Sequence, residues 1–402
     1  MGIDTHSSIE TGRHPTEAVR AERPTVLQVL PALGAGGAER GCVDVATALV
    51  RNGGRALVAS AGGPLVRELA RAGAEHIVLP LASKNPFVMR ANVARLVSII
   101  ERNGVEIVHA RSRAPAWSAI AAARRTGCAF LTTFHGKYSE GNYFKRLYNS
   151  VMVRGDLVIA ISAHIEALIQ ARYGTDPARI RLIPRGIDLE IFNPAHVAAS
   201  RLVQLAQQWR LQDGMPVIML PGRLTRWKGH HVLIDALARL GRLDVRCVLV
   251  GSDQGRSGYR RELEHRVAQL GLTPVVHIVD HCNDMAAAYM LSDVVVSAST
   301  EPEPFGRVTA EAQAMGRPVI ASDHGGAREI VLASEMSWLT PPGDAEALAE
   351  ALSQALALDP RVRQQLAQSM IVRAHERFSK ETMCERTLAV YDELRERATV
   401  GA

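Results

Sequence analysis

The chain has 402 residues, of which 47% are hydrophobic and 22% charged, and these values exclude wholesale disorder and favour two folded domains of comparable size. Its five cysteines include no C-x-x-C pair, so neither a disulfide framework nor a zinc site is expected. The net charge of +6 is uneven, because residues 1–194 carry 24 Lys and Arg against 16 Asp and Glu, whereas the remainder carries 23 against 25. This basic half suits an anionic membrane surface or a phosphate-bearing acceptor, with an ordinary solvated surface as an equal alternative. Nucleic acid is a poorer fit, since only 4% of the residues are aromatic.

The start of the chain carries no apolar segment of the kind that a secretory signal needs. Residues 1–24 mix acidic with polar residues and are predicted to be a disordered lead-in, so the fold should begin near Thr25. Nowhere does an apolar run approach the roughly 18 residues of a membrane span. We therefore expect a cytoplasmic protein, with peripheral attachment at the inner face of the plasma membrane as an open alternative.

Short β-branched runs alternate with amphipathic segments along most of the chain, which is the pattern of parallel sheets covered by helices. Seven strands are predicted in the first half, at residues 25–33, 55–61, 75–81, 106–112, 129–135, 155–162 and 179–186. Six more are predicted at residues 216–222, 245–252, 275–280, 294–299, 318–322 and 337–341. Helical sequence then runs from Asp344 to about Thr399, with an interruption at Asp359-Pro360.

This order of elements predicts an α/β protein built from two doubly wound, Rossmann-like domains. The alternation breaks at a Pro between residues 190 and 215, so the boundaries are placed at 25–195 for the first domain and 210–375 for the second. Residues 376–402 are expected to form a helix that packs back on the first domain. Open α/β sheets bind ligands at the carboxyl ends of their strands, so the active site should lie in a cleft between the domains.

Residues suited to phosphate and hydroxyl binding gather where strands of the second domain should end. Arg223 follows one strand and Lys228 precedes the next helix, a spacing that suits a phosphate clamp as well as a plain surface pair. Residues 304–307 form a helix start whose free N–H groups would face the cleft. Glu311 falls two turns into that helix among apolar neighbours and needs hydroxyl donors, such as those of a ribose or a sugar. From the first domain, His109 ends a strand that should point at the same cleft.

Glu303 and Glu311 form a Glu-x7-Glu pattern within EPEPFGRVTAEAQAMG, which resembles the retaining GT-B glycosyltransferases of family 4. Further blocks match in the order of that family, namely LGAGGAER (33–40), VHARSR (108–113), Phe134-His135-Gly136, IPRGID (183–188) and PGRLTRWKG (221–229). The resemblance covers roughly residues 25–395. It implies a GT-B fold and transfer of a sugar from a nucleoside diphosphate donor of the UDP or GDP type to an acceptor hydroxyl. Retention at the anomeric carbon is implied as well. No metal is expected, because the sequence contains no H-x-x-H, H-E-x-x-H or Asp-x-Asp motif, and no cofactor is expected besides the donor.

The resemblance also implies roles for single residues, with the first domain holding the acceptor and the second the donor. Arg223 and Lys228 would grip the diphosphate, and Glu303 would hold hydroxyls of the transferred sugar. Glu311 would bind the ribose, while His135 would lie near the sugar and the acceptor. Further donor contacts are expected at Gly36, Gly37, Phe305, Gly306, Arg307 and Val308. Catalysis would depend on Arg223, Lys228, Glu303 and His135.

The acceptor is indicated only by residues 135–156 and their surroundings. That stretch combines basic residues with aromatic ones, an arrangement that suits a lipid–water interface and equally suits a helix packing its aromatics inward. The residues are Lys137, Tyr138, Tyr143, Phe144, Lys145, Arg146, Tyr148 and Arg154. Together with VHARSRAPAW, the stretch resembles bacterial glycosyltransferases of lipopolysaccharide core assembly, mannosyltransferases among them. This implies a carbohydrate or lipid-linked acceptor in lipopolysaccharide or surface polysaccharide assembly.

Other functions stay open as alternatives. Another GT-B enzyme, such as a nucleotide-sugar epimerase or a phosphorylase, would share the donor motifs, and so would a non-catalytic nucleotide-sugar-binding protein. A nicotinamide dehydrogenase is disfavoured, because the glycines at 34–37 are followed by Ala-Glu-Arg and do not complete G-x-G-x-x-G.

Overall fold

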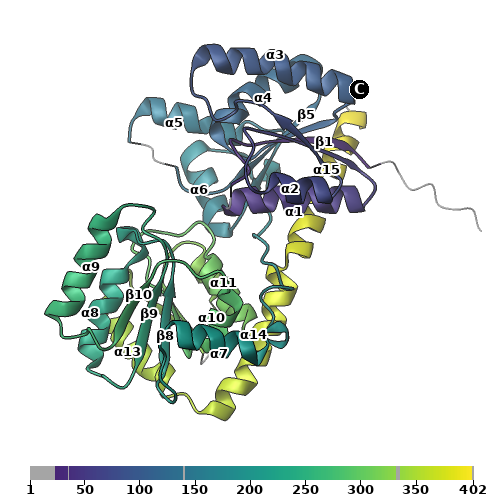
Figure 1. Cartoon of the computed structure of the whole chain (residues 1–402). Coiled ribbons are helices and arrows are strands. Elements are labelled where there is room, and N and C mark those ends of the chain that lie inside the picture. Colours follow the sequence, from purple (N-terminus) through teal and green to yellow (C-terminus); the bar gives the residue numbers. More distant parts are fainter. Residues whose placement is uncertain (1–22, 35, 139–140, 332–335, 401–402) are drawn as a thin grey trace, which may run out of the picture.

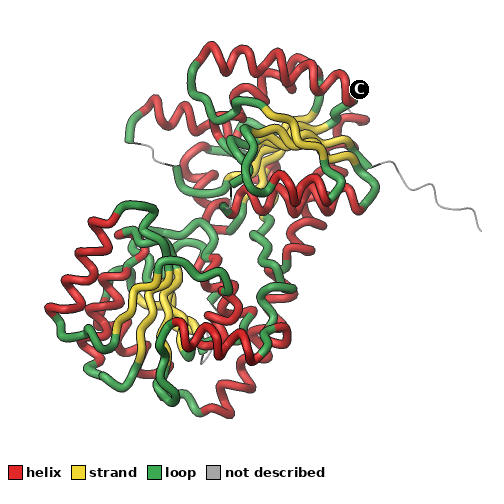
Figure 2. The backbone as a smooth tube through the Cα atoms, in the orientation of Figure 1, coloured by secondary structure: helices red, strands yellow, loops and turns green. Residues whose placement is uncertain are grey.

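The computed structural model describes residues 23–34, 36–138, 141–331 and 336–400, and these form two α/β units joined by two stretches of chain (Figure 1). Each unit has one parallel sheet, with seven strands in the order β3-β2-β1-β4-β5-β6-β7 and six in the order β10-β9-β8-β11-β12-β13. In Figure 2 the strands gather at the centre of each unit and the helices surround them. The predicted architecture of two doubly wound sheets is confirmed.

The N-terminal unit contains the seven-stranded sheet and the helices around it. Its strands are β1 (Thr25–Val29), β2 (Arg55–Ser60), β3 (Glu75–Val78), β4 (Ile107–Ala110), β5 (Ala129–Phe134), β6 (Leu157–Ala160) and β7 (Ile180–Leu182). Its helices are α1 (Gly37–Arg51), α2 (Val66–Arg71), α3 (Pro86–Asn103), α4 (Arg113–Thr126), α5 (Tyr143–Asn149) and α6 (Ala163–Tyr173).

The C-terminal unit contains the six-stranded sheet. Its strands are β8 (Val217–Pro221), β9 (Arg246–Val250), β10 (Val276–Val279), β11 (Val294–Ser297), β12 (Val319–Ser322) and β13 (Ser337–Thr340). Its helices are α7 (Ala199–Gln208), α8 (His230–Leu240), α9 (Ser257–Gln269), α10 (Met285–Leu291), α11 (Arg307–Ala314), α12 (Ala327–Ile330) and α13 (Ala345–Leu356), and α14 (Pro360–Phe378) and α15 (Lys380–Val400) end the described chain.

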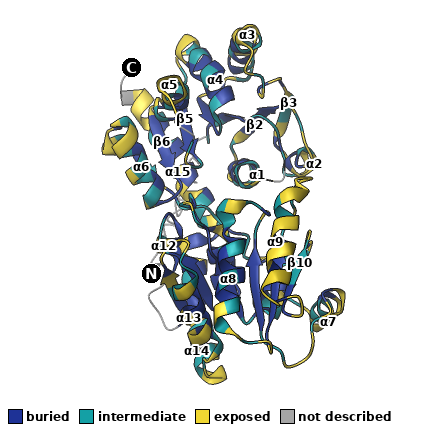
Figure 3. Ribbon diagram, turned by 90° about the vertical axis from the view of Figure 1, so that its left-hand side faces the viewer, coloured by how far each residue is buried: buried dark blue, intermediate teal, exposed yellow. Residues whose placement is uncertain are grey.

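The strands are short apolar runs because helices cover both faces of each sheet. All four residues of β11 and of β12 are buried, whereas the edge strand β3 has none that is buried. Figure 3 shows the central strands as buried and exposed residues on outer helices such as α9. All thirteen predicted strands are present, each one to five residues shorter than expected. The residues trimmed from their carboxyl ends enter the loops that carry the polar side chains.

The last two helices return the chain from the C-terminal unit to the N-terminal unit (Figure 1). The predicted interruption at Asp359-Pro360 is confirmed, but a second break at Ser379 was not predicted. There the Ser379 hydroxyl accepts a hydrogen bond from the backbone N–H of Thr382 at 3.0 Å, which caps the start of α15. No helix in the described part of the chain is long and apolar enough to cross a membrane.

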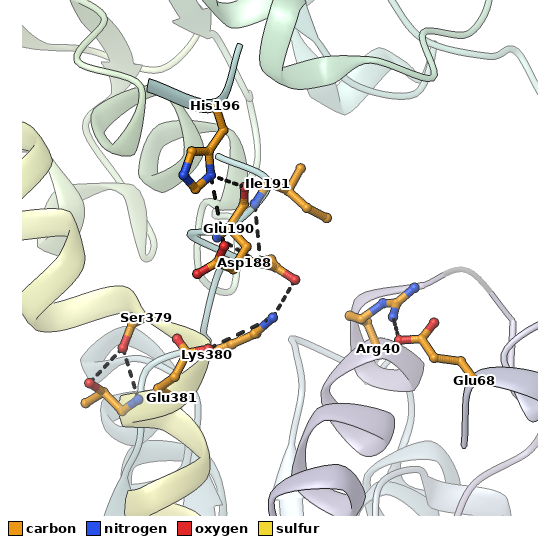
Figure 4. A network of polar contacts seen from close by, with 10 residues as sticks. Arg40, Glu68, Asp188, Glu190, Ile191, His196, Ser379, Lys380 and Glu381 are labelled. Carbon is orange, nitrogen blue, oxygen red and sulfur yellow. Dashed lines mark hydrogen bonds and ion pairs between the residues drawn. The ribbon is translucent and has the colours of Figure 1, made fainter. Parts of the chain in front are cut away.

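Two connecting segments of the chain, around Ile187 and around Ser379, lie side by side where the units are joined. The backbone N–H of Ile187 donates to the carbonyl of Phe378 at 2.7 Å, and that of Lys380 donates to the carbonyl of Ile187 at 3.0 Å. Beside them the Lys380 ammonium pairs with Asp188 at 2.7 Å (Figure 4). The outgoing and returning connections are therefore tied to each other at the same place.

Candidate functional site

Both sheets reverse their strand order at one point, between β1 and β4 in the N-terminal unit and between β8 and β11 in the C-terminal unit. Such switch points are where open α/β sheets leave a crevice at the carboxyl ends of their strands. The two carboxyl edges meet, because the Ser162 hydroxyl donates to the Pro304 carbonyl at 2.5 Å. In addition, the Glu329 carboxylate accepts from the backbone N–H groups of Ala163 and His164 at 2.8 and 2.7 Å. Pro304, which starts the predicted phosphate-binding segment 304–307, therefore lies at this junction.

Glu303 lies in the loop after β11 and is only 7% exposed. Its Oε1 accepts hydrogen bonds from the Lys228 ammonium at 2.7 Å, from the Ser297 hydroxyl at 3.2 Å and from the Ser299 hydroxyl. Burial alone would raise the pKa of Glu303, but the charge of Lys228 and the three hydrogen bonds lower that pKa below its usual range. The carboxylate is therefore held in its charged form although it is almost covered.

Lys228 and Arg223 come from the loop between β8 and α8, which includes a 3₁₀ turn at Arg226–Lys228. The Lys228 side chain is 13% exposed and points at Glu303, and its ammonium also lies 4.5 Å from the centre of the Trp227 ring. Arg223 is exposed, and its guanidinium forms no bond with any residue that the structure describes. Lys228 is thus paired with the Glu303 carboxylate, whereas the Arg223 guanidinium is available to bind a ligand.

Glu311 is buried on α11, four residues after Arg307. Its Oε1 accepts from the Arg307 guanidinium at 2.7 Å, and its Oε2 accepts from the Tyr289 hydroxyl at 2.8 Å. Burial and the neighbouring charge of Glu311 raise the pKa of Tyr289, so this hydroxyl stays protonated and keeps donating. Both oxygens of Glu311 therefore have partners within the protein.

Gly306 begins α11 with φ of +100°, a conformation that only glycine adopts without strain. Arg307 and Val308 follow as the first residues of the helix, so their N–H groups have no partner within it. Phe305 is buried and packs edge to face on Phe378, with ring centres 5.7 Å apart. The start of α11 is therefore fixed in position by the packing of Phe305 in the core.

On the N-terminal unit, Gly36 caps α1 with its backbone and Gly37 is the first helical residue. His135 follows β5, and both of its ring nitrogens are buried and lack a hydrogen-bond partner among the described residues. Burial, followed by the charges of Arg185 and Arg111, lowers the pKa of His135 well below its usual range. His135 is therefore neutral at neutral pH.

His109 does not face the junction, contrary to expectation. It is fully buried, with Nδ1 2.8 Å from the Tyr391 hydroxyl of α15 and Nε2 2.7 Å from the Thr133 hydroxyl. Because both ring nitrogens are satisfied inside the N-terminal unit, His109 is a core residue that fixes α15 to the sheet.

The aromatic residues of 138–148 divide into two groups. Tyr138 and Tyr148 pack inward, and the Arg113 guanidinium stands 4.2 and 5.9 Å from the centres of their rings. Tyr143 and Phe144 on α5 are 73% and 77% exposed and contact each other edge to face. The inward-packing alternative therefore holds for Tyr138 and Tyr148, whereas Tyr143 and Phe144 lie at the surface.

Two family models match the chain, one for each unit. Residues 35–191 match "Glycosyltransferase Family 4" and residues 204–376 match "Glycosyl transferases group 1". The crystal structure of a glycosyltransferase from Rickettsia africae is similar over 92% of this chain and 98% of its own, with 37% identity and a TM-score of 0.86. The chain is a family 4 glycosyltransferase of the GT-B fold. The resemblance drawn from the sequence motifs is confirmed.

Other relatives of this family 4 glycosyltransferase carry more specific names. The D-inositol 3-phosphate glycosyltransferase of Xylanimonas cellulosilytica is 35% identical over 214 residues, which cover 52% of this chain and 51% of that enzyme. The match thus spans about half the length of this curated relative. Anabaena HepE, whose crystal structure holds UDP and glucose, is 26% identical, with a TM-score of 0.78 over 92% of this chain and 99% of its own.

The structure adds partners that the sequence motifs of this family 4 glycosyltransferase do not reveal. Ser297 and Ser299 donate to Glu303, and Tyr289 donates to Glu311. Arg307 and Glu311 stand four apart on one helix, a spacing from which their ion pair was predictable. Among the described residues, no three His, Cys, Asp or Glu side chains are grouped so that they could hold a metal ion.

Proposed function

We propose that this protein transfers a sugar from a nucleoside diphosphate sugar to an acceptor hydroxyl with retention at the anomeric carbon. The observation that carries the proposal is the state of Glu303. Its Oε1 takes three hydrogen bonds, whereas its Oε2 accepts none from the described residues. A buried, charged carboxylate with one free oxygen can accept hydrogen bonds from the hydroxyls of a bound sugar.

The donor diphosphate is proposed to lie between Arg223, Lys228 and the free N–H groups of Arg307 and Val308. When the bond between the anomeric carbon and the phosphate oxygen breaks, the leaving diphosphate gains negative charge. Cations and helix N–H groups that are already in place stabilise that charge without rearranging. Glu311 is proposed to accept from the ribose hydroxyls, which would replace the Tyr289 or Arg307 bond that it has here.

Retention can proceed through a covalent intermediate on a carboxylate or on one face of the sugar. Glu303 is a poor nucleophile, because Lys228 and two hydroxyls already hold its charge. We therefore favour the same-face route, in which the acceptor oxygen bonds to the anomeric carbon as the phosphate leaves. The acceptor proton passes to the departing phosphate oxygen, so the enzyme itself supplies no base.

Replacing Glu303 by Gln tests this proposal. The amide keeps the shape but loses the charge that faces the sugar and Lys228, so turnover should fall at least 100-fold while binding of UDP or GDP changes little. Glu301, which is exposed in the same loop, gives a matched control as Glu301→Gln with expected wild-type turnover. Wild-type turnover in Glu303→Gln would contradict the assignment. If the wild-type protein instead epimerises the donor, or forms a sugar phosphate from free phosphate, it catalyses one of the other GT-B reactions. If the wild-type protein shows no turnover at all, it is a nucleotide-sugar-binding protein.

The nucleotide is proposed to be UDP or GDP. HepE, which is similar over nearly its full length, holds UDP and glucose in its crystal structure. A thermal-shift panel of UDP-, GDP- and ADP-sugars distinguishes the donors, because a ligand that binds the folded state raises the unfolding temperature. A response to GDP-mannose alone would support a mannosyltransferase.

The acceptor is proposed to be a carbohydrate or lipid-linked intermediate of lipopolysaccharide or surface polysaccharide assembly, reached at an anionic membrane surface. Tyr143, Phe144 and Leu147 of α5 expose apolar surface beside Lys145 and Arg146, a composition suited to the lipid headgroup region. Sedimentation with vesicles tests this. The wild type is expected to bind anionic but not zwitterionic vesicles, and Phe144→Ser is expected to lose this binding. Equal recovery of the wild type and of Phe144→Ser in the supernatant would contradict the proposal.

A further inference from the structure

Two glycines one turn apart on α1 leave room for two guanidinium groups. Arg185 donates to the carbonyl of Gly37. A Cβ atom on Gly41 would stand 3.5 Å from Nη2 of Arg185 and 3.7 Å from Nη1 of Arg111. Both arginines therefore lie against the first turns of α1, at the point where the strand order of this sheet reverses.

This is an unfavourable place for cations that have no counterion. The start of a helix carries a partial positive charge of its own. In the part of the chain that the structure describes, neither Arg111 nor Arg185 forms an ion pair with a carboxylate. Burial, and then repulsion by Arg307 and Arg111, lower the pKa of Arg185 to about 10, although the charges of Asp44 and Glu39 act in the opposite direction.

Polar atoms behind Arg185 also lack partners. Arg111 is 5% exposed, and its Nε donates to Gln28 at 2.6 Å, but its Nη2 is buried without a hydrogen bond to any described residue. The two ring nitrogens of His135 are likewise buried without a hydrogen bond to any described residue. These groups line one small cavity together with Gly41, Thr133 and Met383. A water molecule could satisfy such hydrogen bonds, but it would leave the two positive charges uncompensated.

We propose that Arg185 and Arg111 form an anion site on the N-terminal unit that receives a phosphate group of a substrate. Guanidinium groups match the geometry of phosphate oxygens and bind them in pairs of charge-assisted hydrogen bonds. Arg185 reaches the phosphate by giving up its bond to the Gly37 carbonyl, and Arg111 supplies a second, fixed charge behind it. This inference rests on the proposed transferase function, in which the phosphate belongs to the acceptor or to the donor diphosphate.

Binding measurements with inorganic phosphate and with UDP, by isothermal titration calorimetry, test the site. Arg185→Gln should weaken phosphate binding on the order of 10- to 100-fold, the usual effect of losing a charge-assisted hydrogen bond. Arg185→Lys keeps the charge and should restore part of the affinity. Arg67→Gln removes an exposed arginine from α2 of the same unit and should bind both ligands like the wild type. Thermal unfolding midpoints verify that each variant is folded.

The two ligands distinguish the source of the phosphate. Weaker phosphate binding with unchanged UDP binding supports a site for the acceptor, whereas weakening of both supports a site for the donor diphosphate. Arg185→Gln with wild-type affinity for both ligands would overturn the proposal. A failure of the transferase function is seen separately, because wild-type protein that binds phosphate but never turns over a nucleotide sugar would contradict only that function.

Discussion

Replacing Ser299 with Ala tests how Glu303 is kept charged in a buried position. The Ser299 hydroxyl is one of three donors to Oε1 of Glu303, beside Lys228 and Ser297, and Ser299 is itself buried. A hydrogen bond to a charged group contributes about 1.5–3 kcal/mol. Its loss should therefore reduce the ratio of charged to protonated Glu303 by a factor of about 10 to 100.

The sign follows from the direction of the pKa shift of Glu303. Because the native contacts lower this pKa, the charged form persists above it and is lost as pH falls through it. Without the Ser299 bond the loss should begin at higher pH, so the acidic limb of kcat/KM against pH should move toward neutrality. Ser322→Ala, at the same end of the neighbouring strand β12, is the matched control and should leave the limb in place. An unchanged limb in Ser299→Ala would refute the reasoning.

Three further changes separate binding from stability. Arg223→Ala should weaken UDP binding about tenfold in calorimetry and leave the free energy of unfolding within about 0.5 kcal/mol, since the side chain is exposed and forms no bond with described residues; wild-type affinity would count against a diphosphate contact. Tyr289→Phe should lower the free energy of unfolding by about 1–3 kcal/mol in urea, because the buried Glu311 loses a donor; an unchanged midpoint would contradict this. Burial, and then Arg111 and His135, lower the pKa of His109, so the unfolded chain binds that proton more readily and stability should fall as pH decreases below about 6.5. His109→Gln should lose part of this pH dependence in thermal melts at pH 7.5 and 5.5, and identical slopes would argue against it.

The sheets were predictable because parallel strands covered on both faces must be continuous apolar runs, and such runs stand out between polar helices. The break at Ser379 was not, since Phe378 and Lys380 continue the helical pattern on either side of it. It arises from tertiary contacts, in which Phe378 and Lys380 bond with the backbone of Ile187. Ser379 is itself a favoured capping residue, but the contact that selects this position for the break is made by a distant stretch of chain.

The same distinction applies to the site. Glu303 and Glu311 could be identified from their motif, but Tyr289 lies 22 residues before Glu311 on another helix, and nothing in its own surroundings in the sequence indicates a partner. His109 was wrongly expected at the junction, because a strand end fixes the edge a residue occupies but not the elements that cover it. Here α15, nearly three hundred residues later, covers His109 through Tyr391.

The distribution of paired charges differs between the two units, and this difference agrees with the roles proposed for them. In the C-terminal unit each buried carboxylate of the site has its own cation, Glu303 with Lys228 and Glu311 with Arg307. In the N-terminal unit the described cations Arg111 and Arg185 have no such partner, and residues 1–194 carry the excess of Lys and Arg over Asp and Glu. A unit with compensated charges needs its ligand mainly for hydrogen bonds, whereas a unit with uncompensated cations gains most from a ligand that brings negative charge. The proposed phosphate contacts of Arg111 and Arg185 are therefore where the N-terminal unit gains most from its substrate.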